Sequence, residues 1–218
     1  MNQRYEELET NLRAVEREVS SYSPTLIVVM KTYPISDVDI LSQLGVKNFG
    51  ENRSSEGVEK SAAIPGQWHY QGEIQSKKIR EILSWASCIH SLDNVGHAQK
   101  IENSLADTGG AVGLFLQLSL DGDPERGGVT ESNLFTLAEQ VSEFPSINLL
   151  GIMCVPPVSQ EPISAFAKIQ AVHQRFITQY PAAKSLSAGM SGDYLIALDH
   201  GATHIRVGSK ILGSRQYD

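Results

Sequence analysis

The stretch Leu26-Ile27-Val28-Val29-Met30-Lys31-Thr32-Tyr33-Pro34 is an apolar run that ends abruptly in a lysine. A short, continuous apolar run of this kind is typical of a buried strand. A lysine at the end of such a strand lies at the rim of an apolar structure, where partial desolvation lowers its pKa and exposes a nucleophilic lone pair. Strand-end lysines more often only mark the exit of the chain into solvent, so the rest of the sequence decides between these two interpretations of Lys31.

Seven more short apolar runs follow, and they alternate with longer amphipathic segments. Strands are predicted over residues 25–30, 48–49, 68–71, 88–91, 112–120, 149–154, 185–188 and 204–207, with helices beginning near residues 38, 54, 77, 95, 131, 163, 193 and 209. An additional N-terminal helix is predicted from Leu8, Leu12, Val15 and Val19, which have helical spacing. Eight strand-then-helix units after an extra helix predict an α/β fold, a single (β/α)8 TIM barrel over residues 1–218, in preference to an open doubly wound sheet.

Composition excludes several classes of protein. The formal charge is −7, from 18 basic and 25 acidic residues, which opposes a nucleic-acid-binding function. Cys88 and Cys154 each lie in an apolar segment and are expected to be reduced, buried thiols. His69 and His90 fall within predicted strands, where we expect core residues and no metal ligation. The charged N-terminus lacks a signal peptide and no apolar run is long enough to span a bilayer, so we expect a cytoplasmic protein with no membrane partner.

The loops after the seventh and eighth predicted strands are rich in glycine and serine. They read Gly189-Met190-Ser191-Gly192 and Gly208-Ser209-Lys210-Ile211-Leu212-Gly213. Barrels often bind phosphate with these two loops, because glycines let the backbone approach and a helix N-terminus presents its N–H groups. Glycines also serve tight turns and helix caps. Two such loops at the two expected strand ends favour a phosphate site, to which Ser191 and Ser209 add hydroxyl groups.

Arg206 lies inside the eighth predicted strand, where a guanidinium group can be buried only if acceptors receive its hydrogen bonds. A carboxylate partner is the simplest explanation. The alternative combines three features, because a lysine that can form an imine, a phosphate site and an arginine facing a ring nitrogen are the parts of a pyridoxal phosphate (PLP) site. An arginine that donates to the pyridine nitrogen keeps that nitrogen unprotonated, which weakens the ring as an electron sink.

Five segments also resemble the pyridoxal phosphate homeostasis protein family. They are Lys31-Thr32-Tyr33-Pro34, Phe49-Gly50-Glu51-Asn52, Trp68-His69-Tyr70-Gln71-Gly72 with Gln75, Leu186-Ser187-Ala188-Gly189-Met190-Ser191, and Ile205-Arg206-Val207-Gly208-Ser209-Lys210-Ile211-Leu212-Gly213. The resemblance implies a fold like the N-terminal barrel domain of alanine racemase, with PLP held as a Schiff base on Lys31. It also implies phosphate contacts from Ser191, Gly208 and Ser209, ring contact from Asn52, and pairing of Arg206 with the pyridine nitrogen; Met190, in a matching segment, completes the expected cofactor-binding set. Met30 and Lys77 depart from the family pattern.

Racemases of this fold class use two bases, the lysine and a tyrosine from a separate C-terminal β domain. The sequence ends at Asp218, directly after the predicted barrel, so we expect no second domain and no robust catalytic activity. The predicted function is therefore intracellular PLP homeostasis by a monomer that stores, buffers or delivers the cofactor, with PLP-dependent apo-enzymes as recipients. The alternatives are a small PLP-dependent amino-acid racemase or deaminase, and a cofactor-free aldolase-like barrel that uses Lys31 on a sugar phosphate. The aldolase alternative leaves Arg206 without a role.

Overall fold

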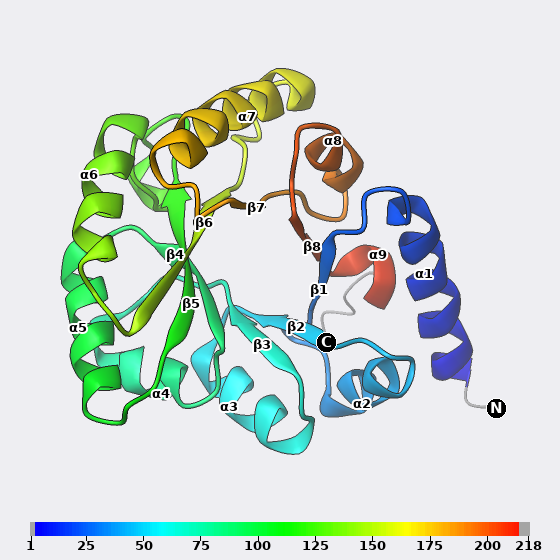
Figure 1. Ribbon diagram of the computed structural model, residues 1–218. Helices are drawn as coiled ribbons and strands as arrows, with labels where there is room; N and C mark the ends of the chain where they lie inside the picture. Colours follow the sequence, from blue (N-terminus) through cyan, green and yellow to red (C-terminus); the bar gives the residue numbers. More distant parts are fainter. Residues whose placement is uncertain (1–2, 214–218) are drawn as a thin grey trace.

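Eight parallel strands form a closed barrel, and helices surround it on the outside (Figure 1). The computed structural model describes residues 3–213. The strands are β1 (Thr25–Val29), β2 (Asn48–Glu51), β3 (Gln67–Tyr70), β4 (Cys88–Leu92), β5 (Val112–Leu118), β6 (Ile147–Cys154), β7 (Ser185–Ser187) and β8 (His204–Val207). The helices are α1 (Gln3–Val19), α2 (Ile35–Gln43), α3 (Ser54–Ala63), α4 (Ile79–Leu83), α5 (Val95–Ala106), α6 (Glu131–Ser142), α7 (Pro162–Gln179), α8 (Tyr194–Asp199) and α9 (Ser209–Leu212).

The predicted barrel and its extra helix are confirmed, and the differences lie at element boundaries. The second strand continues to Glu51, two residues beyond the predicted end, because the Glu51 carboxylate is buried in an ion pair with Lys60. Helix α2 begins at Ile35, three residues before the predicted start at Val38, directly after Pro34. The helix predicted near Lys77 begins at Ile79, after a 3₁₀ turn over Ser76–Lys78.

Two layers of side chains fill the molecule, one between the barrel and its helices and one inside the barrel. Alternation along β5 separates them, since Leu114 and Leu116 join the outer core while Phe115 packs with Cys88 and Met153 in a separate inner cluster. His90 stacks on Phe115 at a centroid distance of 4.5 Å, which places the imidazole in the inner layer as well. The interior is therefore partly polar, whereas branched aliphatic residues usually dominate there.

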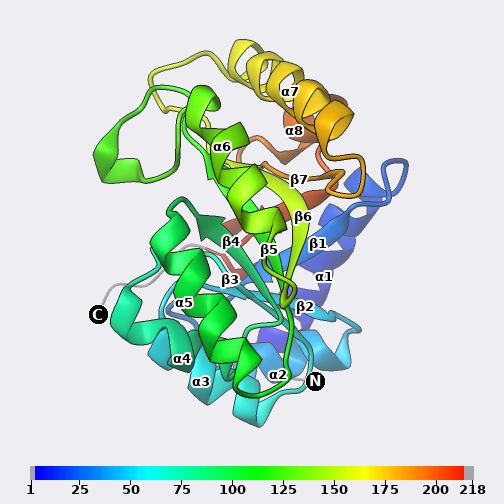
Figure 2. The same cartoon turned by 60° about the vertical axis from the view of Figure 1, so that its left-hand side comes forward.

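Helix α1 packs against α9, the helix that follows β8, close to where the barrel closes. The closing pair is β1 with β8, which run parallel with Val28 opposite Val207. Figure 1 shows α1, in blue, next to α9, in red, and Figure 2 shows α1 beside β1. Arg4 of α1 donates to the carbonyl of Leu212 at 3.0 Å, and Asn11 donates to the carbonyl of Ile211 at 3.0 Å. Within residues 3–213, no helix is both long enough and apolar enough to cross a membrane.

Candidate functional site

The predicted site residues lie in or after four strands that are consecutive around the barrel, β7, β8, β1 and β2. The strand register sets the level of these residues along the barrel axis. Val29 lies opposite Gly50 of β2, and Val28 lies opposite Val207 of β8. Lys31, Asn52 and Gly208 are therefore all at the carboxyl ends of neighbouring strands, where barrels place their functional groups. The structure thus brings together residues that are up to 177 positions apart in the sequence, from Lys31 to Gly208.

Lys31 is half-buried and belongs to a tight turn between β1 and α2. The next residue, Thr32, has a backbone φ of +69°, in the left-handed region that residues other than glycine seldom adopt. Beneath this turn, the buried Lys60 of α3 donates to the carbonyl of Met30 at 2.7 Å. Lys60 is not among the residues that the sequence indicated for the site. Its spacing of four residues from Glu56 was the one signal in the sequence for an ion pair there.

Asn52 follows β2 and has a buried side-chain oxygen, Oδ1, with no hydrogen-bond partner among the described residues. The amide nitrogen of Gln71, at the end of the adjacent strand β3, is likewise buried and without a partner there. Unpaired buried amide groups are costly. Two of them at neighbouring strand ends are suited to a polar ligand at this rim.

The two predicted phosphate loops are joined by one hydroxyl group. Ser191 Oγ accepts from the backbone N–H of Gly208 at 3.2 Å and from that of Lys210 at 3.4 Å. Met190 lies in the first loop with a half-exposed side chain, and its own N–H donates to Asp193 Oδ1 at 2.6 Å. Ser209, exposed, is the first residue of α9. Backbone N–H groups and hydroxyls therefore converge here, which is the donor set that a phosphate group needs.

Arg206 is only 5% exposed, and its guanidinium group is held by neutral acceptors. Nη1 donates to the carbonyl of Ser187 at 2.9 Å and to Ser187 Oγ at 2.7 Å, and Nη2 donates to the carbonyl of Cys154 at 3.4 Å. No carboxylate of residues 3–213 forms an ion pair with it, so the carboxylate partner considered for this arginine is wrong within that range. Burial lowers the pKa of Arg206 to about 10.

A chain of hydrogen bonds continues from Arg206 into the barrel. Because Arg206 donates to Ser187 Oγ, the Ser187 hydroxyl is left to donate to His90 Nδ1, 2.9 Å away. His90 Nε2 is 2.9 Å from His69 Nδ1, and His69 Nε2 is 3.1 Å from the Asn48 amide oxygen. Burial lowers the pKa of His90 well below its usual value and that of His69 to about 3, so both rings are neutral.

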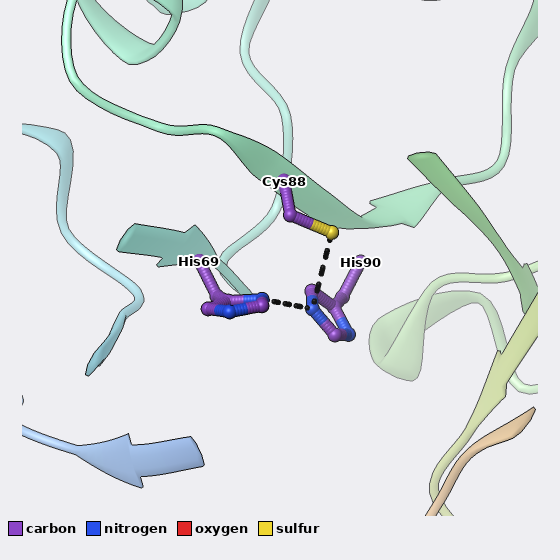
Figure 3. A group of neighbouring side chains, drawn as sticks. All are labelled: His69, Cys88 and His90. Atoms are coloured by element: carbon purple, nitrogen blue, oxygen red, sulfur yellow. Dashed lines mark hydrogen bonds between the residues drawn. The ribbon is translucent and has the colours of Figure 1, made fainter. Parts of the chain in front are cut away.

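Figure 3 shows His69 and Cys88 both directed at His90. The three ligand-type atoms lie within 4.8 Å of one another, a separation that a metal ion could bridge. All four ring nitrogens already have hydrogen-bond partners, however, and burial raises the pKa of the Cys88 thiol to about 12. The expectation that both histidines are hydrogen-bonded core residues is therefore confirmed, as is that of a free, buried Cys88.

These groups fit PLP, a planar ring that carries a phosphate and an aldehyde. The fit rests on the orphaned amide of Asn52, on the guanidinium group of Arg206 that lacks a carboxylate, and on the donors around Ser191. Gly208 lies close to the adjacent strand β1, since a Cβ there would lie 3.3 Å from the carbonyl oxygen of Val29. A side chain at this position would therefore crowd the end of β1, two residues before Lys31.

Comparison with known proteins gives the same picture. The family model described as "Alanine racemase, N-terminal domain" matches residues 4–216. A protein of Corynebacterium glutamicum named pyridoxal phosphate homeostasis protein is 38% identical over 201 residues, covering 88% of this chain and 91% of the relative. A protein of the same name from Mycobacterium tuberculosis is 33% identical over 213 residues, covering 88% of this chain and 83% of the relative.

Solved structures extend the comparison. PipY of Synechococcus elongatus, in its structure with PLP bound, superimposes with a TM-score of 0.87 at 28% identity, covering 94% of this chain and all of PipY. Alanine racemase of Clostridium difficile gives a TM-score of 0.80 at 15% identity, covering 98% of this chain and 58% of the racemase, which shows the shared fold alone. With the family model matching nearly the whole chain and relatives of one name above 30% identity, the chain belongs to the alanine racemase N-terminal domain family and, within it, to the pyridoxal phosphate homeostasis proteins.

Proposed function

We propose that this protein binds PLP at the rim formed by β7, β8, β1 and β2, and that it stores, buffers or delivers the cofactor. The observation that carries the proposal is the convergence of Lys31, Arg206 and the Ser191 loop at one end of the barrel. PipY, which resembles this chain over 94% of its length, has been solved with PLP bound. The name shared by the relatives supports homeostasis as the purpose of binding.

Each residue has a distinct task in this proposal. PLP supplies an aldehyde that condenses with an amine, with loss of water, and a pyridine ring that can withdraw electrons. The Lys31 amine holds the cofactor covalently as a Schiff base. Ser191, Gly208 and Ser209 contact the phosphate group, and Asn52 contacts the ring.

Arg206 favours holding the cofactor over turnover. Its guanidinium group has no acceptor hydrogen-bonding site and stays charged, because even its lowered pKa of about 10 is well above neutrality. An N–H aimed at the pyridine nitrogen therefore keeps that nitrogen unprotonated, and the ring withdraws electrons less strongly. Weaker electron withdrawal favours a carrier over a catalyst. We propose that this carrier acts as a monomer in the cytoplasm and serves PLP-dependent apo-enzymes.

Reductive trapping tests the proposal. Purified protein loaded with PLP is reduced with borohydride, and the modified peptide is identified by mass spectrometry. We expect the modification on Lys31 and its loss in Lys31→Ala. Lys78→Ala, which removes a half-buried lysine paired with Glu81, should leave the modification on Lys31 intact. Modification of Lys77, Lys78 or Lys210 in place of Lys31 would refute the assignment.

A further inference from the structure

The turn that presents Lys31 is held from both sides by one buried charged network. Two peptide groups flank Lys31. The one before it contains the Met30 carbonyl, and the one after it contains the Thr32 N–H. The Met30 carbonyl accepts from Lys60 Nζ at 2.7 Å, and the Thr32 N–H donates to Glu56 Oε2 at 2.8 Å. Side chains of α3 therefore hold both peptide groups in place through hydrogen bonds.

Lys60 uses its full bonding capacity in this network. Its ammonium group has three N–H donors, and three oxygens receive them: the Met30 carbonyl, Glu51 Oε1 at 2.5 Å and Glu56 Oε2 at 2.9 Å. The side chain is only 5% exposed. A lysine is therefore the group that fits, since a methionine offers no donor and the planar group of an arginine cannot point three ways from one atom.

The two carboxylates have different surroundings. Glu51, at the end of β2, is fully buried, and desolvation raises its pKa, so Lys60 is the partner that keeps its charge compensated. Glu56 is partly exposed, with 21% of its side chain accessible. The same oxygen of Glu56 receives both Lys60 Nζ and the Thr32 N–H, which links the two sides of the turn through one atom.

Stability alone is a poor explanation for this arrangement. Buried ion pairs seldom stabilise a fold more than apolar side chains of the same volume, because desolvation offsets their attraction. The network does hold Thr32 in its left-handed conformation, with φ +69°, and strained backbone of this kind persists only where the surroundings enforce it. The conformation of Thr32 sets the direction in which the chain leaves Lys31.

We propose that Lys60 and Glu56 are positioning residues that fix the backbone on both sides of Lys31 and so aim its amine at the cofactor, with Glu51 holding Lys60 in place. This inference rests on the proposed function, since it assumes that Lys31 is the lysine that binds PLP. None of the three residues has to touch the cofactor, because all act through the backbone of the turn.

Substitutions of Glu56 separate positioning from charge. Glu56→Ala removes the acceptor for Thr32, whereas Glu56→Gln retains an amide oxygen that can accept the same hydrogen bond. Glu59→Ala is the matched control, because Glu59 is an exposed glutamate on the same helix. We expect attachment of PLP to Lys31, followed by its absorption band and by borohydride trapping, to slow by about tenfold in Glu56→Ala, equivalent to one hydrogen bond to a charged group. Glu56→Gln and Glu59→Ala should stay close to wild type.

Amide hydrogen exchange at Thr32, measured by NMR without PLP, gives a readout independent of the cofactor. Protection should fall in Glu56→Ala and be retained in Glu56→Gln. The double variant Glu51→Gln/Lys60→Met removes the hydrogen bond from Lys60 to the Met30 carbonyl without leaving an unpaired charge at position 51. It should also attach PLP about tenfold more slowly than wild type. Failure of the wild type itself to trap PLP on Lys31 would refute the proposed function. Normal trapping in the wild type with unchanged rates in Glu56→Ala and the double variant would refute the positioning role alone.

Discussion

Arg206 carries a buried charge that no described carboxylate neutralises, and such a group costs the fold free energy. A methionine of similar length would avoid this desolvation but would lose the hydrogen bonds to Ser187 and Cys154. We expect Arg206→Met to leave the free energy of unfolding of the cofactor-free protein unchanged or raise it by about 1 kcal/mol, while PLP affinity falls. Urea unfolding and PLP titration measure the two effects.

Arg175→Met is a suitable control for that substitution, because Arg175 is exposed and pairs with Glu131 on the surface. It should change neither stability nor PLP affinity appreciably. A loss of more than about 2 kcal/mol in Arg206→Met would mean that the hydrogen bonds to Ser187 and Cys154 outweigh desolvation. Arg206 would then be a structural residue of the barrel interior.

The sequence indicated where single residues lie in the fold when their position along a strand determined that place. Lys31 and Arg206 were identified in this way, one at the end of a strand and the other within one. Lys60 and Glu51 were not, because their pairing depends on how α3 packs against β2 and on a backbone carbonyl 30 residues away. No local pattern encodes a contact of that kind.

At the scale of elements, the turn from β7 to α8 depends on Gly189. Its φ is +93°, and a Cβ there would lie 2.7 Å from the Cβ of Ala197 and 2.8 Å from the Cα of Tyr194. Gly189→Ala should therefore destabilise the protein by about 1–3 kcal/mol and weaken phosphate binding by displacing Ser191. Thermal unfolding and PLP titration check this, and a wild-type result from both would show that the turn tolerates a side chain.

Gly192, three residues further along the same turn, provides the matched control for Gly189→Ala. A Cβ at Gly192 would meet no heavy atom within 4 Å, and its φ lies outside the left-handed region. Gly192→Ala should therefore leave stability within about 0.5 kcal/mol of wild type. The contrast between these two variants separates conformational strain from the mere presence of a methyl group.

The strands that carry buried histidines make stability depend on pH. In the unfolded chain His69 takes up a proton below about pH 6.5, whereas in the folded protein its pKa is about 3. The unfolded state thus binds more protons between these values, and stability falls as the pH falls through 6.5. His69 alone should lower the free energy of unfolding by about 2 kcal/mol at pH 5 relative to pH 7. Urea unfolding of wild type and His69→Gln at both pH values measures this, and an equal pH dependence of the two would contradict it.

Element boundaries were predicted less accurately than element types, for a physical reason. The apolar runs that mark strands record burial of side chains, so β2 was predicted to end at Phe49, before Gly50 and the polar Glu51. Its burial is made possible by Lys60, which the run itself does not contain. The other seven strands lie where they were predicted, with ends that differ from the predicted ones by at most two residues.

At the scale of the whole molecule, the proposed site spans the seam where the barrel closes. Lys31 follows β1 and Arg206 lies in β8, and these two strands pair to complete the barrel. In the unfolded chain these groups are separated by 175 residues, so only the folded protein can bind PLP with all of them. The free energy of binding is therefore added to the free energy of unfolding.

This linkage predicts the thermal shift that PLP produces. At a concentration one hundred times its Kd, a ligand adds about 2.7 kcal/mol of stability, which in a chain of this length raises Tm by about 5–10 °C. Pyridoxal, which lacks the phosphate group, should give a much smaller shift at the same concentration, because the donors around Ser191 and Gly208 are left without their anion. Scanning calorimetry with PLP, pyridoxal and inorganic phosphate tests this. Equal shifts with PLP and pyridoxal would show that the two glycine-serine loops contribute nothing to binding, and would leave Lys31 and Arg206 as the main contacts.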